Sequence, residues 1–109
     1  MTWTEISVSD FALGKTTYVV DVREVDEYLD GHIPGAVNVP LSVLTEKYSE
    51  IAKHETVYVV CQLGGRSARA CEYLSNLSEF DGTHFVNVGG GTAAWILEGN
   101  EVMTGDSPS

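Results

Sequence analysis

Short apolar runs alternate along this chain with segments in which apolar residues recur at helical spacing. Valine, isoleucine and aromatic residues dominate the runs, as is typical of strands buried in a parallel sheet. The predicted strands cover residues 3–6, 18–22, 36–39, 56–60 and 85–88. Helices are predicted around Phe11, from Glu24 to Gly31, over 41–53, over 68–77 and from Ala93 to Gly99. This alternation predicts a parallel sheet with helices packed on both of its faces.

Serine residues stand where three of the predicted helices begin. A serine side chain can accept a hydrogen bond from a free N–H group in the first helical turn. Ser7 or Ser9 is placed to cap the first helix, Ser42 the third and Ser67 the fourth. The sequence alone leaves the choice between Ser7 and Ser9 open.

Length and composition indicate one domain that spans residues 1–109. The chain is 43% hydrophobic and 20% charged, which is ordinary for a globular protein. Residues 103–109 are small, polar and turn-prone, so they are predicted to form a frayed tail.

Charge and hydropathy exclude some classes of binding partner and indicate in which cellular compartment the protein is found. The formal net charge of −10 argues against nucleic acid and against anionic membrane surfaces. No stretch approaches the roughly 20 apolar residues of a membrane-spanning helix, and the first ten residues do not resemble a secretory signal. The two cysteines do not suggest a disulfide framework. We therefore expect a cytoplasmic protein.

Cys61 is the candidate nucleophile of this chain. It follows the apolar strand over 56–60 and precedes a helix, so it is expected at the carboxyl end of a strand, where α/β sheets bind ligands. Gly64 and Gly65 let the following turn direct several N–H groups inward, and the helix N-terminus and Arg66 add positive charge. Each of these features favours a thiolate over a thiol.

Asp21, Arg23 and the three histidines are the other polar residues that could belong to a site. Asp21 and Arg23 end the strand over 18–22 on the side of Cys61, where they either shape the site or form an ion pair that fixes the strand end. His32 lies in a turn without a partner acid, which favours a structural role. The other two histidines make no metal-ligand spacing with a cysteine, so no metal is predicted.

Four stretches of the chain resemble single-domain rhodanese-like sulfurtransferases, and they follow the order seen in that family. The family's active-site pattern C-x-x-G-x-R-[ST] is matched by Cys61-Gln62-Leu63-Gly64-Gly65-Arg66-Ser67. The other three stretches are DVREVDEY at 21–28, GHIPGAVNVP at 31–40 and GGTAAW at 90–95. This resemblance implies a three-layer α/β/α domain with a five-stranded, mostly parallel sheet and the cysteine strand at its centre.

The resemblance also implies an activity. Cys61 would take a sulfane sulfur from thiosulfate or a persulfide donor, and the resulting persulfide would pass it to a thiol, a protein acceptor or cyanide. Arg66 is the candidate for orienting the oxygens of the donor, while Gln62 and Leu63 would tune the choice of acceptor. No cofactor is implied beyond the covalent persulfide.

Two other functions are possible for such a chain: phosphatase or arsenate reductase chemistry, and a non-catalytic role in protein interaction. Related loops of arsenate reductases and dual-specificity phosphatases have five residues between cysteine and arginine, whereas four separate Cys61 from Arg66. Non-catalytic rhodanese-like interaction modules commonly lack the cysteine or the arginine, and both are present here.

Cys71 lies ten residues after Cys61 on the apolar side of its helix, so we expect it to be a buried structural thiol.

Overall fold

Five parallel strands form the central sheet of this protein. The computed structural model describes residues 3–14 and 18–108. The strands pair in the order β1-β5-β4-β2-β3, and every strand pair is parallel. Their bounds are Thr4–Ser7 for β1, Val19–Asp21 for β2, Ala36–Asn38 for β3, Thr56–Val60 for β4 and His84–Gly89 for β5. The predicted fold class is confirmed, with the cysteine-bearing strand β4 in the centre.

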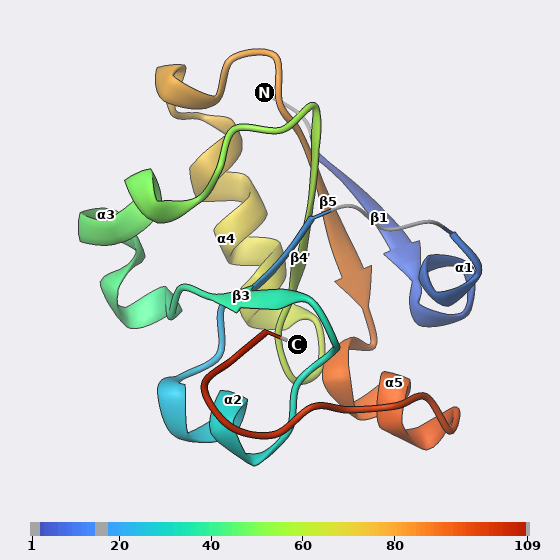
Figure 1. Cartoon of the computed structure of the whole chain (residues 1–109). Helices are drawn as coiled ribbons and strands as arrows, with labels where there is room; N and C mark the ends of the chain where they lie inside the picture. Colours follow the sequence, from blue (N-terminus) through green and yellow to red (C-terminus); the bar gives the residue numbers. More distant parts are fainter. Residues whose placement is uncertain (1–2, 15–17, 109) are drawn as a thin grey trace.

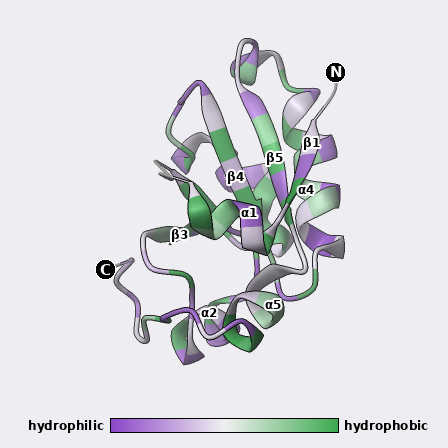
Figure 2. Ribbon diagram, turned by 90° about the vertical axis from the view of Figure 1, so that its right-hand side faces the viewer, coloured by the Kyte–Doolittle hydropathy of each residue, from purple (hydrophilic) through white to green (hydrophobic). Residues whose placement is uncertain are grey.

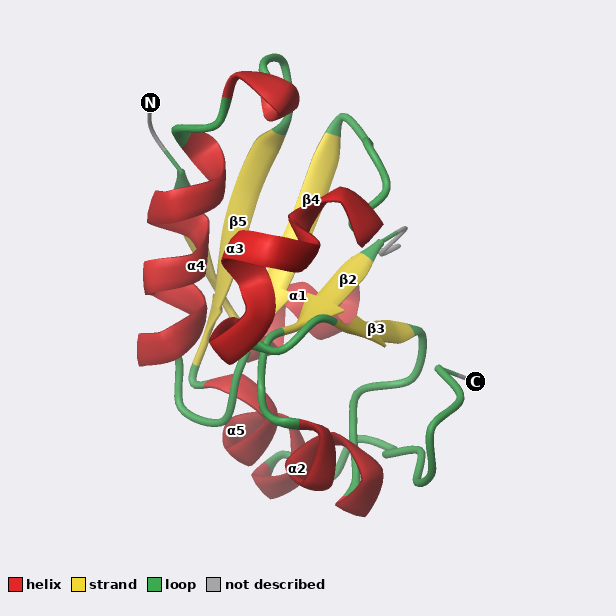
Figure 3. Cartoon of the chain, turned by 90° about the vertical axis from the view of Figure 1, so that its left-hand side faces the viewer, coloured by secondary structure: helices red, strands yellow, loops and turns green. Residues whose placement is uncertain are grey.

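Helices cover both faces of the sheet and its carboxyl edge. They are α1 (Val8–Leu13), α2 (Val25–Asp30), α3 (Leu44–Lys47), α4 (Gly65–Ser75) and α5 (Gly91–Leu97). Helices α3 and α4 lie on one face and α1 on the other, while α2 and α5 lie below the carboxyl ends of the strands (Figures 1 and 3). Within residues 3–14 and 18–108, no helix is long and apolar enough to cross a membrane.

Alternate residues of β4 face two separate hydrophobic cores. Val57 and Val59 belong to the core beneath α3 and α4, whereas Val60 belongs to the core beneath α1. All three side chains are fully buried. Figure 2 shows hydrophobic residues, in green, within β4 and β5. A strand that is buried on both faces reads as a continuous apolar run, which explains the strength of this signal in the sequence.

The first helix begins as predicted, but the third does not. Ser7 accepts a hydrogen bond from Asp10 N (3.1 Å), so Ser7 and not Ser9 is the cap. The single helix predicted over 41–53 is wrong, because α3 is only four residues long and lies between two 3₁₀ turns. Apolar residues three apart fit a 3₁₀ turn as well as an α-helix, so their spacing did not distinguish the two. Ser42 does not cap this segment and instead donates to Glu24 Oε1 (2.8 Å).

Residues 103–108 are hydrogen-bonded to the segment around His32, which the prediction of a frayed tail over 103–109 did not anticipate, and Ser109 lies outside the described residues. Met103 and His32 exchange two backbone hydrogen bonds, of 2.8 and 2.9 Å. Further along, Gly35 N donates to Pro108 O (2.7 Å). The imidazole of His32 is buried, stacks on Tyr28 and lies 2.9 Å from Ser107 O. The turn after α2 therefore supplies backbone partners to the tail, and His32 has the structural role expected of it.

Candidate active site

Cys61 lies directly after β4, between the sheet and the helices at its carboxyl edge. Its main chain is fixed by α5, because Thr92 N donates to Cys61 O (2.9 Å) and Ala93 N donates to Gln62 O (3.0 Å). Cys61 is 1% exposed, whereas Leu63 at the rim of the loop is 74% exposed. The sulfur of Cys61 therefore lies at the base of a short loop that two helices, α4 and α5, hold in place.

A thiolate cradle surrounds the sulfur of Cys61. It consists of the Ser67 hydroxyl and the backbone N–H groups of Leu63, Gly64 and Ser67. Gly64 N lies 3.1 Å and Ser67 Oγ 3.2 Å from Cys61 Sγ. Burial on its own raises the pKa of Cys61, but hydrogen bonds from Ser67, Gly64 and Leu63 outweigh burial, so the net pKa is lowered. The predicted preference for a thiolate is therefore supported by the donors that face the sulfur.

The two glycines of the loop differ in what they contribute. Gly64 is the N-cap of α4 and has φ +112°, a left-handed conformation that glycine adopts without strain. Gly65 is the first residue of α4, and an added Cβ would meet no atom within 4 Å. Of these two positions, only position 64 has a backbone conformation that requires glycine.

Ser67 does not cap α4, contrary to the prediction. It lies inside the first turn, and its fully buried hydroxyl faces Cys61 Sγ, Gly64 O (3.3 Å) and Asn87 Oδ1. Because a glycine occupies the cap position, the serine is free to turn toward the sulfur. Sequence reasoning missed Asn87, although a polar residue inside the apolar strand over 85–88 was a signal for it.

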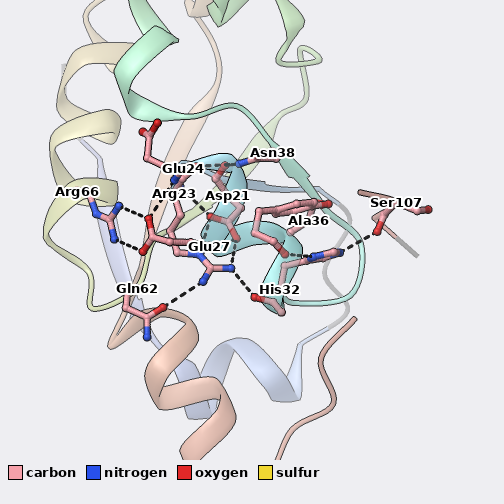
Figure 4. A network of polar contacts seen from close by, with 12 residues as sticks. Asp21, Arg23, Glu24, Glu27, His32, Ala36, Asn38, Gln62, Arg66 and Ser107 are labelled. Carbon is pink, nitrogen blue, oxygen red and sulfur yellow. Dashed lines mark hydrogen bonds and ion pairs between the residues drawn. The ribbon is translucent and has the colours of Figure 1, made fainter. Parts of the chain in front are cut away.

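Arg66 is paired with an acid that was not predicted to be in the site. Arg66 Nη1 and Nη2 lie 2.8 and 3.0 Å from the two carboxylate oxygens of Glu27 (Figure 4). This hydrogen-bonded pairing lowers the pKa of Glu27 to about 2, although partial burial opposes the shift. Arg66 also lines an open pocket of about 280 Å³ together with Cys61, Gln62, Leu63 and Gly65. The guanidinium of Arg66 therefore lines the same pocket as Cys61, but it is paired with the carboxylate of Glu27.

Asp21 and Arg23 form a buried ion pair, with Arg23 Nη2 3.0 Å from Asp21 Oδ2. The same guanidinium donates to Gly31 O (2.7 Å) and to Gln62 Oε1 (3.2 Å), and Figure 4 shows the contact with Gln62. Of the two interpretations left open by the sequence, the ion pair is present, and Arg23 also contacts the loop that follows Cys61. The pair thus links the end of β2 to the candidate site.

We expect Asp21→Asn to destabilise the protein by about 3 kcal/mol or more, because it leaves the Arg23 charge buried without a counter-ion. Asp21 is fully buried and Arg23 is 4% exposed, so water cannot replace the lost carboxylate. Urea unfolding at constant m-value measures the change. Replacing both partners, with Asp21→Asn and Arg23→Met together, should restore part of the loss. A single-variant loss below about 1 kcal/mol, the range of exposed pairs, would contradict the prediction.

Cys71 is a buried free thiol of α4. Burial, followed by the nearby Glu5 and Cys61, raises its pKa to about 12, so it is not a nucleophile near neutral pH. In the part of the chain that the structure describes, no group of three or more histidine, cysteine or acidic residues could hold a metal ion.

Fold and site together define a class of protein: a parallel α/β domain with a free cysteine of lowered pKa at the carboxyl end of its central strand. The chain belongs to the rhodanese-like domain family, whose sequence pattern matches residues 9–98. A sulfurtransferase of Allochromatium vinosum is 36% identical over 85 residues, which cover 78% of this chain and 77% of that protein. The thiosulfate sulfurtransferase PspE of Escherichia coli is 38% identical over 73 residues, covering 65% and 67% of the two chains. The crystal structure of a rhodanese-related protein from Thermoplasma volcanium superposes with a TM-score of 0.82 at 36% identity, covering 93% of this chain and 98% of that one.

Proposed function

We propose that this protein is a sulfurtransferase that carries a sulfane sulfur as a persulfide on Cys61. The observation that carries the proposal is the thiolate cradle, in which Gly64 N and Ser67 Oγ face Cys61 Sγ at 3.1 and 3.2 Å. Such donors favour the ionised sulfur, which is the nucleophilic form. Family membership supports the same chemistry, since relatives are named sulfurtransferases.

With thiosulfate as donor, the Cys61 thiolate attacks the outer sulfur of the donor. A new S–S bond forms, the sulfur–sulfur bond of thiosulfate breaks, and its electron pair leaves with sulfite. The product is a Cys61 persulfide whose terminal sulfur is anionic. Backbone N–H groups around the loop can stabilise this charge, as an oxyanion hole stabilises oxygen.

An acceptor completes the cycle. A thiolate attacks the terminal sulfur of the persulfide and becomes a persulfide itself, while Cys61 returns to the thiolate. Cyanide attacks in the same way and gives thiocyanate. Leu63, which is 74% exposed at the rim of the pocket, is placed to contact a small thiol or an acceptor protein.

Arg66 is proposed to bind the oxygens of an anionic donor, in competition with Glu27. Removing the charge of Glu27 by Glu27→Gln should therefore free the guanidinium and lower KM for thiosulfate about fivefold, with a smaller change in kcat. The difference should shrink at high salt, because both partners are one-third exposed. Initial rates of thiocyanate formation at two ionic strengths measure the effect.

Asp26→Asn is the matched control for this prediction, since it removes one negative charge from an exposed residue of the same helix. It should leave KM within about twofold of the unaltered protein. An unchanged KM in Glu27→Gln would show that Arg66 does not contact the donor.

The test of the proposed function is the intact mass of the protein after incubation with thiosulfate. We expect a gain of one sulfur atom, located on the peptide that contains Cys61 and removed by cyanide or a small thiol. If no sulfur is gained while Cys61 still reacts with iodoacetamide, thiosulfate is not the donor, and low-molecular-weight persulfides are tested next. Failure of all these donors would contradict the proposal and favour a non-catalytic interaction module.

A further inference from the structure

A buried asparagine on the neighbouring strand approaches the thiolate cradle. Asn87 lies on β5, is 1% exposed and accepts a hydrogen bond from the Ser67 hydroxyl. Its amide nitrogen lies 2.8 Å from Glu5 Oε1 and 3.2 Å from Gly64 O. A buried amide in the middle of a sheet is costly unless it is hydrogen-bonded, and this one is bonded on both sides.

The orientation of the Asn87 amide is fixed by these partners. A carboxylate and a backbone carbonyl only accept hydrogen bonds, so the NH₂ group must face Glu5 and Gly64. Glu5 is held opposite Asn87 by the parallel register of β1 and β5. The oxygen of the amide is therefore directed at Ser67, where it requires a donor.

Ser67 cannot satisfy all of its neighbours at once. A hydroxyl has one proton, and three acceptors surround Ser67 Oγ: Asn87 Oδ1, Cys61 Sγ at 3.2 Å and Gly64 O at 3.3 Å. When the proton is directed at Asn87, the lone pairs of Ser67 Oγ can only accept from Cys61, which suits a neutral thiol. When it is directed at Cys61, it stabilises a negative sulfur.

We propose that Asn87 is a positioning residue that gives the Ser67 hydroxyl a second acceptor, so that this hydroxyl turns with the charge on Cys61 Sγ. The hydroxyl donates to a charged sulfur and turns to Asn87 when the sulfur is neutral. No proton leaves Ser67 in this rotation, and Glu5 keeps Asn87 in the receiving orientation.

This inference rests on the proposed function for its role in catalysis. Cys61 Sγ is charged as the free thiolate and uncharged as the inner sulfur of a persulfide, when the charge lies on the terminal sulfur. By turning, the Ser67 hydroxyl would donate to Cys61 Sγ in the free thiolate and to Asn87 in the persulfide. The hydroxyl itself is held between α4 and β5, so the rotation needs no movement of the backbone.

The decisive experiment is the pH dependence of Cys61 alkylation by iodoacetamide, which requires no sulfur transfer. Asn87→Leu keeps the size of the side chain and removes the competing acceptor. We expect its alkylation midpoint to move to lower pH, because Ser67 can then donate to the sulfur without competition. In the Ser67→Ala background, the same substitution should produce no such shift.

Arg66 and Cys71 on α4 interact with the charge of Cys61, and Glu5 on β1 interacts with Cys71. Asn87→Leu removes the hydrogen bond to Glu5 in both backgrounds, so the comparison between the two backgrounds isolates Ser67. An equal shift in both backgrounds, or a shift to higher pH only when Ser67 is present, would overturn the proposal.

Glu5→Met provides a second test if Asn87→Leu does not fold. Glu5 is exposed, and this substitution keeps the length of the side chain while it removes the oxygen acceptor that fixes the Asn87 amide. Because a charge is also lost, the result is again the difference between the Ser67 and Ser67→Ala backgrounds. We expect a larger shift to lower pH when Ser67 is present, and equal shifts would contradict the proposal. If alkylation behaves as expected but no donor loads sulfur, the positioning role stands and the proposed function fails.

Discussion

Cys61→Ser is expected to abolish sulfur loading and to reduce thiocyanate formation from thiosulfate and cyanide to below about one thousandth. The serine hydroxyl remains protonated in the thiolate cradle, because its pKa lies far above that of a thiol. Even if it attacked, it would form a sulfur–oxygen bond in place of a persulfide. Initial-rate measurements and intact mass after thiosulfate treatment both report the loss.

Cys71→Ala is the control for this prediction. Cys71 is a fully buried thiol whose pKa is raised to about 12, so its removal should leave sulfur loading intact. Alanine fills the site with a small apolar side chain, as a buried structural cysteine does. Sulfur loading that survives in Cys61→Ser and disappears in Cys71→Ala would show that the nucleophile has been assigned to the wrong residue.

Gly91→Ala should destabilise the fold by about 3 kcal/mol or more and should impair sulfur transfer at the same time. An added Cβ would lie 2.4 Å from Cys61 O and 2.5 Å from Gln62 O, which are backbone atoms of the loop after β4. Gly91 also has φ +62°, which side chains rarely adopt. Relief of the clash would separate α5 from the loop and break the hydrogen bonds that fix Cys61 O and Gln62 O.

Gly99→Ala isolates the conformational part of that cost. Gly99 has φ +84°, but a Cβ there would meet no atom within 4 Å. It should cost about 1 kcal/mol, the penalty for a left-handed residue, and leave activity unchanged. Urea unfolding of both variants gives the comparison. Equal losses would mean that the loop can yield to the new methyl group.

The close contact at Gly91 also explains how a loop this short remains ordered. Its carbonyl groups are held by the first N–H groups of α5, and its N–H groups are directed at Cys61 Sγ. The two sides of the loop are therefore bonded to different partners. Substitutions that move α5 should consequently change the position of Cys61 Sγ relative to its hydrogen-bond donors, even though α5 contributes no side chain to the thiolate cradle.

The sequence by itself predicted the strands and the class of sheet, and it singled out Cys61 as the candidate nucleophile. Each of these depends on neighbours along the chain: the apolar run of β4 marks a strand buried on both faces, and the residues after Cys61 close a turn that leads into α4. The single helix predicted over 41–53 was wrong because apolar spacing of three fits more than one helical geometry.

The tertiary structure alone decided which charges and hydrogen bonds complete the site. Arg66 meets Glu27 across 39 residues of sequence, Ser67 meets Asn87 across 20, and His32 meets Ser107 across 75. Such pairs are set by the order of the strands and by side-chain packing, and no local spacing encodes them. The sequence thus placed the candidate nucleophile Cys61 at the end of a strand, while the fold determined which groups surround its sulfur, because these come from different strands and helices that meet only at the carboxyl edge of the sheet.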